Sequence, residues 1–281
     1  MNLVPNQASG GDLALKRYAN GRLLGLRVNR YSFWSHWREL ADYYLPRRYK
    51  WLITPIQWNR GSPMNQNIID NCGTIAARDL AAGITTGVSS PTRPWFGLKV
   101  GRIDTTQTSP ASLWLAEVVR LMRLVFQESN FYTGIAQLWA DLVLFNTAVM
   151  IIYEDFDDVI RCINPCAGEY YLDNDGKMRP CIFYREFVMT TAQIVDEFGL
   201  ENVSQTVKSL YENPDGSGKT REIVIAHAIE PITDRRLWGL PEQFEYGEIY
   251  WEWQSAAGQQ GGGTNATGFL RKRGFHERCV L

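Results

Sequence analysis

A glycine-rich turn followed by a lysine and a hydroxyl residue occurs late in the chain, in the segment Asp215-Gly-Ser-Gly-Lys-Thr220. In a phosphate-binding loop, such a lysine contacts nucleotide phosphates and the hydroxyl contacts magnesium. That loop also needs a glycine where Asn213 stands, and it lies between a strand and a helix, whereas here a strand-like run follows the turn. We therefore favour a plain turn between a helix and a strand, with a nucleotide-binding enzyme kept as an alternative.

Two other clusters carry side chains that bind metals. Cys162, Cys166 and Cys181 carry thiols suited to zinc, but a structural zinc site needs four ligands and no histidine lies between these cysteines. The acidic segment 154–158 carries oxygens suited to calcium or magnesium, but it lacks the ligand spacing of a dedicated calcium loop. We expect buried or half-buried thiols and a hairpin turn here, and no metal or cofactor.

Basic residues beside aromatic residues form the third group, because Arg and Lys contact phosphates while Trp and Arg are enriched in protein interfaces. Residues 1–60 hold ten Lys and Arg against three Asp and Glu, whereas the whole chain has 29 against 30. The remainder is acidic (19 against 27), which favours contact with another protein chain over direct contact with nucleic acid. The candidates for a subunit interface or a DNA contact are Trp34, Trp37, Arg47, Arg48, Lys50, Arg93, Arg271, Lys272 and Arg273.

The composition is that of a globular protein with enough chain to bury a core. The 281 residues are 45% hydrophobic and 21% charged, which excludes collagen-like and fully disordered classes. The longest apolar run without a charge, 142–153, is about half of the roughly 20 residues of a membrane helix. Five scattered cysteines do not predict a disulfide framework, and with three histidines in the chain we expect His36 and His227 to be packing residues, not general bases.

Helical periodicity dominates the first half of the chain. Apolar and aromatic residues recur at helical spacing over 31–45, 66–84 and 131–145, and another helix starts at Pro110 behind the N-cap residue Ser109. We expect residues 1–30 to form an arm that is partly flexible and residues 31–147 to form a helical layer.

Strand-like alternation begins at Ala148. Turn sequences separate four runs that favour strands, which predicts an antiparallel meander over 148–154, 159–163, 169–172 and 178–187. After two short helices, strands are predicted again at 221–230 and 248–254. The predicted fold class is α+β, with a helical N-terminal layer packed on a mixed, largely antiparallel sheet. Thr190 and Gln193 resemble a capping box at the start of a short helix that Gly199 ends. The sheet with its short helices would occupy residues 148–255, followed by a Gly-rich loop over 256–268.

Seven short segments, spread over residues 30–281, occur together in an order that is typical of one protein family. They are Trp34–Arg48 (WSHWRELADYYLPRR), Asn67–Asp70 (NIID), Leu80–Phe96 (LAAGITTGVSSPTRPWF), Ser129–Tyr132 (SNFY), Gly168–Tyr171 (GEYY), Tyr184–Phe187 (YREF) and Tyr250–Glu252 (YWE). Together they resemble the head-to-tail connecting protein, or portal, of short-tailed bacteriophages. The part from Gly83 to Phe96 is the most specific of them.

The resemblance implies a structural subunit and not an enzyme. The subunit would belong to a homo-oligomeric ring, commonly a dodecamer, at one vertex of the capsid. That ring would serve head assembly, DNA packaging and ejection, and tail attachment. The implied partners are further copies of the chain, major capsid and scaffolding proteins, a terminase that supplies ATP hydrolysis, tail adaptor proteins and double-stranded DNA in the channel. The implied location is the portal vertex of the virion, and the host cytoplasm during assembly, with no membrane contact.

The resemblance also implies that the predicted elements form the wing of a portal subunit. Residues 269–281 would start a strand pair that leads into stem and clip regions, which this sequence does not contain. An adaptor protein that contacts DNA through Arg47, Arg48 and Lys50 stays open as a further alternative.

Overall fold

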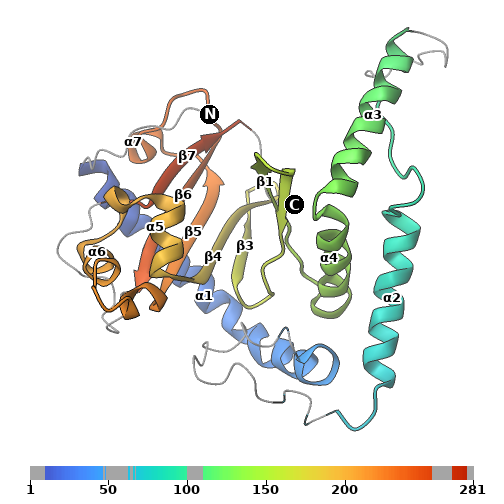
Figure 1. Cartoon of the computed structure of the whole chain (residues 1–281), viewed down its shortest axis with the longest axis horizontal. Helices are drawn as coiled ribbons and strands as arrows, with labels where there is room; N and C mark the ends of the chain where they lie inside the picture. Colours follow the sequence, from blue (N-terminus) through green and yellow to red (C-terminus); the bar gives the residue numbers. More distant parts are fainter. Residues whose placement is uncertain are drawn as a thin grey trace. The chain divides into compact units, whose positions relative to one another are not determined.

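The computed structural model describes residues 10–46, 48, 63, 66, 68–99, 110–254 and 268–276. The chain divides into two compact units, shown together in Figure 1. The first unit combines Met1–Trp34 with Gly168–Arg278, and the second combines Ser35–Ala167 with Cys279–Leu281. Each unit is described by itself.

Helices and antiparallel strands make up most of the described residues. The helices are α1 (Gly10–Tyr44), α2 (Cys72–Val88), α3 (Pro110–Glu128), α4 (Phe131–Phe145), α5 (Thr191–Phe198), α6 (Gln205–Tyr211) and α7 (Arg235–Trp238), with 3-10 turns η2 (Leu200–Asn202) and η3 (Ser217–Thr220). The strands are β1 (Ile151–Asp155), β2 (Val159–Ile163), β3 (Tyr170–Asn174), β4 (Pro180–Thr190), β5 (Glu222–Pro231), β6 (Tyr246–Gln254) and β7 (Arg271–Phe275). The predicted α+β class is confirmed.

The first unit is built on a five-stranded antiparallel sheet in the order β3-β4-β5-β6-β7 (Figure 1). Because side chains alternate along a strand, β5 turns Ile223 and Ile225 to one face and Ala226 and Ala228 to the other. Helices α5 and α6 pack on the face with the isoleucines, and the first half of α1 packs on the face with the alanines. The sheet therefore has a hydrophobic core on each side.

Helix α1 begins at Gly10, whereas the periodicity predicted a helix from residue 31 and an arm before it. The reason is a stripe of small and apolar side chains at helical spacing, Leu15, Ala19, Leu23 and Leu26, which are all buried against the sheet. The residues between them are mostly polar or charged, so the pattern is weak in the sequence. Tertiary burial is what stabilises this part of the helix.

The second unit joins α2, α3 and α4 to a separate two-stranded sheet made of β1 and β2. Met150 and Cys162 are buried against Phe131 and Ile135 of α4. The side chain of Asn130, which precedes α4, donates to the Cys162 carbonyl and accepts from its N–H, both at 2.8 Å. These contacts hold the hairpin on the helices, so the boundary between the units lies at residue 167 and not at the predicted change from helix to strand near residue 148.

Several predicted boundaries are confirmed. Helix α4 and strand β2 have the predicted limits, and Thr190 and Gln193 form the predicted capping box at α5, which Gly199 ends. Helix α2 begins later than predicted, at Cys72, and the Asp70 carboxylate accepts the N–H of this first helical residue at 2.8 Å.

Gly247 in β6 gives a test of the packing in the first unit. A Cβ atom added to Gly247 would lie 2.2 Å from the ring of Trp238, which is 1% exposed and cannot move freely. We expect Gly247→Ala to lower the free energy of unfolding by about 1–3 kcal/mol, measured by urea denaturation. Gly21→Ala is the matched control, because no atom lies within 4 Å of its added Cβ and alanine favours the α1 helix. Equal stability of the two variants would contradict this packing.

Candidate functional site

Seven of the nine predicted interface residues are among the described residues, and they lie in different parts of the two units. Arg47 and Lys50 fall outside the described residues. Trp34 is half-buried on α1 and packs against the core of the first unit, and Trp37 is 4% exposed. None of these placements tests a contact with another chain or with DNA, so that role stays a prediction.

Arg48 makes a bidentate ion pair with Asp141 of α4. The Arg48 Nε donates to Asp141 Oδ1 at 3.0 Å, and a terminal guanidinium nitrogen donates to Oδ2. Asp141 also accepts a hydrogen bond from Gln137 at 3.0 Å, and its side chain is 4% exposed. Burial raises the pKa of Asp141, against the lowering effect of Arg48 and Gln137. Arg48 thus compensates a buried carboxylate inside the second unit.

Arg93 ends helix α2. Its guanidinium donates to the carbonyls of Thr86 and Gly87 at 2.9 and 3.3 Å, which are among the last carbonyls of the helix and lack helical partners. A positive charge at this end also interacts favourably with the helix dipole. Arg93 itself is exposed, so the segment Gly83–Phe96 presents this arginine at the surface of the second unit.

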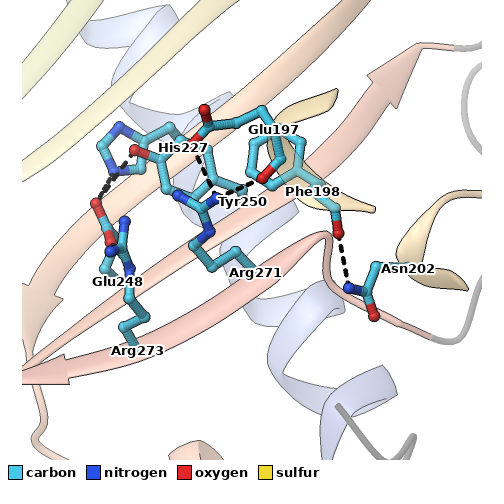
Figure 2. A network of polar contacts seen from close by, with 8 residues as sticks. All are labelled: Glu197, Phe198, Asn202, His227, Glu248, Tyr250, Arg271 and Arg273. Carbon is cyan, nitrogen blue, oxygen red and sulfur yellow. Dashed lines mark hydrogen bonds and ion pairs between the residues drawn. The ribbon is translucent and has the colours of Figure 1, made fainter. Parts of the chain in front are cut away.

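The basic residues of β7 point alternately to the two faces of the sheet. Lys272 lies on the side of α1, where its Nζ contacts Asp12 at 2.9 Å. Arg271 lies on the side of α5, where it pairs with the Glu197 carboxylate at 2.8 Å, donates to the Glu197 carbonyl and covers the Phe198 ring (Figure 2). Arg273, on the same face, contacts Glu248 at 2.9 Å. Lys272 and Arg271 thus attach the edge strand to the two helical layers, and Arg273 attaches it to the neighbouring strand β6.

A buried polar network crosses the face of the sheet on which Arg273 lies. The Arg185 Nε donates to His227 Nδ1 at 3.1 Å, and His227 Nε2 is 2.9 Å from Glu248 Oε1. Glu248 also accepts from the Tyr250 hydroxyl at 3.2 Å and from Arg273 Nε at 2.9 Å, and His227 stacks on Tyr250 with 4.0 Å between ring centroids. Figure 2 shows the part of this network around Glu248.

The electrostatics of this network favour a neutral histidine beside a charged carboxylate. Burial lowers the pKa of His227 to about 4, although Glu248 opposes this shift. Burial alone would raise the pKa of Glu248, but the hydrogen bond from His227 and the charge of Arg273 lower it. Because Arg185 donates to Nδ1, the neutral ring carries its proton on Nε2 and donates it to Glu248. His227 and Glu248 are 0% exposed, so the network is placed to hold the strands together.

The glycine-rich segment before β5 forms the predicted turn. Helix α6 precedes it and β5 follows it, and residues Ser217–Thr220 form the 3-10 turn η3. The Thr220 hydroxyl donates to the Ser217 carbonyl at 3.0 Å, and the Lys219 ammonium lies 5.0 Å from the centroid of the Tyr211 ring. A Cβ on Gly218 would lie 1.9 Å from the Leu210 carbonyl oxygen, so close packing explains this glycine.

The metal-binding alternatives gain no support in the described part of the chain. Cys162, Cys166 and Cys181 are buried free thiols, as predicted, and no group of three or more metal-ligating side chains occurs among the described residues. Residues 154–158 form the tip of the β1–β2 hairpin, also as predicted. His227 is the predicted packing residue, whereas His36 is exposed on α1, because it faces away from the buried Trp37 and Ala41 stripe.

The structure joins residues that sequence reasoning treated separately. It places Arg273 in one network with His227, and it adds Arg185 and Glu248, which we did not predict. The sequence contained a signal for a buried polar network here, since His227 lies on the same face of β5 as the buried Ile223 and Ile225. A titratable residue on such a register needs polar partners from neighbouring strands.

No described helix is long and apolar enough to span a bilayer.

Comparisons with known proteins point to one family. Residues 16–269 match the family described as "Bacteriophage head to tail connecting protein". A protein of Bordetella phage BPP-1 named "Probable portal protein" is 41% identical over 210 residues, which cover 75% of this chain and 37% of that protein. The "Portal protein" of Salmonella phage epsilon15 is 36% identical over 263 residues, which cover 92% of this chain and 44% of that protein. The chain thus spans less than half the length of these relatives.

The network around His227 predicts a stability that depends on pH. Because the pKa of His227 is lower in the folded chain than the ordinary value of about 6.5, the unfolded chain binds the extra proton first as pH falls. The contribution of neutral His227 to the free energy of unfolding is complete above about pH 6.5 and is lost towards pH 4. About 2 kcal/mol of it is lost by pH 5. Urea denaturation at about pH 7.5 and pH 5 would measure it. His227→Gln should lose less stability over this range, and an identical loss in both proteins would contradict the assignment.

The ion pair between Arg48 and Asp141 gives a second test. Arg48→Ala leaves a buried carboxylate without its cation, so we expect the free energy of unfolding to fall by about 3 kcal/mol. The double variant Arg48→Ala/Asp141→Ala should lose less than the sum of the two single losses. Arg120→Ala is the control, because its pair with Glu117 is exposed and should leave the urea midpoint near that of the unmodified chain. Additive losses at Arg48 and Asp141 would contradict the pairing.

Proposed function

Because the chain belongs to the bacteriophage head-to-tail connecting protein family, we propose that it is a structural subunit of a phage portal. The observation that carries the proposal is the family match over residues 16–269, which includes both units of the structure. Two relatives named as portal proteins, at 41% and 36% identity, support it. Since the chain spans less than half of these relatives, the proposal assigns it the wing part of such a subunit.

We further propose the assembly in which this subunit acts. Identical subunits form a closed ring of twelve copies at one capsid vertex of the virion, after assembly in the host cytoplasm. The ring contacts major capsid and scaffolding proteins, receives the terminase during packaging, passes double-stranded DNA and then holds tail adaptor proteins. A ring needs a heterologous interface, in which one surface of a subunit contacts a different surface of the next.

The use of charge inside the chain supports a structural role without catalysis. Arg48, Arg271, Lys272 and Arg273 each pair with a carboxylate of their own unit. The arrangement of Lys219 and Thr220 within a turn supports no nucleotide site. Several apolar side chains of α2 and α3 are exposed instead, which favours contact with other protein chains: Ile75, Leu80, Leu113, Trp114, Leu121 and Leu124.

Imaging of the phage particle tests this function. We expect the chain isolated from virions to form rings with a central hole in negative stain, and an antibody against it to mark a single vertex. ATP hydrolysis should be absent, with no difference between the unmodified chain and Lys219→Ala. A monomer within the virion, or ATP hydrolysis that Lys219→Ala removes, would contradict the proposal.

A further inference from the structure

An open groove lies on the second unit between α3 and the segment that follows α2. Its volume is about 410 Å³, and its walls include Pro94, Leu98, Leu115, Val119, Arg120 and Arg123. Leu98 is 39% exposed, so the groove presents apolar surface to solvent. Most of the residues that line it are apolar, and two arginines of α3, Arg120 and Arg123, also line it.

The charge of this groove is positive. Arg120 pairs with Glu117 one turn earlier, and among the described residues that line the groove no carboxylate faces Arg123. The Arg123 Nε is buried and has no hydrogen-bond partner among the described residues. Lys99, beside Leu98, adds another exposed cation. The groove therefore suits an apolar group that is flanked by carboxylates.

The tip of the β1–β2 hairpin, in the same unit, has that chemistry. Phe156 is 98% exposed, and the residues around it are Glu154, Asp155, Asp157 and Asp158. Arg161 lies near them, with its Nε 3.7 Å from an Asp155 carboxylate oxygen. Burial of this phenylalanine against an apolar surface would be favourable, and the four carboxylates around it would favour a partner surface with cations.

Hydrogen bonds hold this tip in one conformation. The Asp155 carboxylate accepts the N–H groups of Asp157 and Asp158 at 2.9 and 3.4 Å, and the Asp158 carbonyl accepts the Ile160 N–H at 2.8 Å. The bonds from Asp157 and Asp158 lower the pKa of Asp155, so its carboxylate is charged at neutral pH. A preorganised tip loses little conformational entropy when it binds.

We propose that the hairpin tip of one copy of this chain docks into the α3 groove of a second copy. Phe156 would enter the apolar part of the groove, and Asp157 and Asp158 would face Arg123 and Lys99. The two surfaces are complementary in charge and each has an apolar centre, and they belong to different parts of the same unit. Each copy therefore offers one tip and one groove.

This arrangement is a heterologous contact, the kind that closes a ring when it repeats. The inference rests on the proposed function, since it names the residues through which neighbouring subunits of the ring would meet. A buried phenylalanine supplies roughly 150–250 Å² of contact, well below the total of about 1,200 Å² of a stable interface. Phe156 would thus be an anchor that sets the alignment of a larger interface.

Cysteine crosslinking between two variants tests the contact directly. Asp157→Cys carries a thiol at the tip and Ala116→Cys carries one in the groove, in full-length chains in which Cys72 and Cys279 are replaced by serine. With a short thiol crosslinker, we expect a mixture of the two variants to form a dimer with one copy of each. Neither variant alone should crosslink, because a tip meets a groove and not another tip.

A second hairpin provides the matched control. Lys177 lies at the tip of the β3–β4 hairpin in the first unit, next to Met178, which is 79% exposed. Lys177→Cys should not crosslink to Ala116→Cys. Phe156→Ala should weaken the self-association of the chain about tenfold or more, measured by sedimentation, whereas Met178→Ala should leave it unchanged.

The outcomes separate this inference from the proposed function. Rings in virions without a crosslink between Asp157→Cys and Ala116→Cys would overturn the inference and leave the function standing. A specific crosslink without rings would overturn the proposed function and leave the inference standing. Crosslinking that the Lys177→Cys control matches, or self-association that Phe156→Ala does not change, would also overturn the inference.

Discussion

Burial of the five-stranded sheet on both faces is the constraint on which the first unit depends. Helix α1 covers one face, while α5 and α6 pack on the other, so charged side chains on the strands lose contact with water. A buried charge is tolerated only when it has partners, and the buried glutamates of β5 and β6 have them. Glu248 accepts hydrogen bonds from a histidine, a tyrosine and an arginine, and Glu230 accepts from Tyr184. The network aligns β4, β5, β6 and β7 as one layer.

The same constraint explains why several basic residues, whose sequence first suggests contact with phosphate, form ion pairs within the chain. Arg271, Lys272 and Arg273 form a run of three cations in the sequence, yet each finds a carboxylate in a different element of the first unit. In the second unit, Arg48 does the same for Asp141. A chain that uses its arginines in this way gains a rigid arrangement of helices and strands. Such an arrangement would suit the proposed role, in which a subunit transmits contacts around a ring.

The two units differ in how far they bury their aromatic and apolar side chains, which bears on the proposed role of the subunit. The first buries several of its large aromatic residues, including Trp238, Trp251, Tyr184 and Phe269. The second leaves apolar side chains on α2, α3 and the hairpin tip in solvent, where Trp114 and Phe156 are 65% and 98% exposed. Exposed aromatic side chains in a folded unit are costly without a partner, and they are enriched where subunits meet. This contrast favours the second unit as the one that contacts neighbouring chains.

The sequence by itself determined the fold class, the limits of α4 and β2, the capping box at α5 and the membership of a family. Local periodicity and caps act within a few residues, so they can be read without a structure. Only the tertiary structure decided that α1 begins at Gly10, that the β1–β2 hairpin belongs with the helices, and that His227 and Glu248 meet. These features depend on contacts between residues far apart in the chain, which give no local signal. The sequence predicts the element on which each candidate residue lies, but not its hydrogen-bond or ion-pair partners, because strand register and helix packing determine those partners.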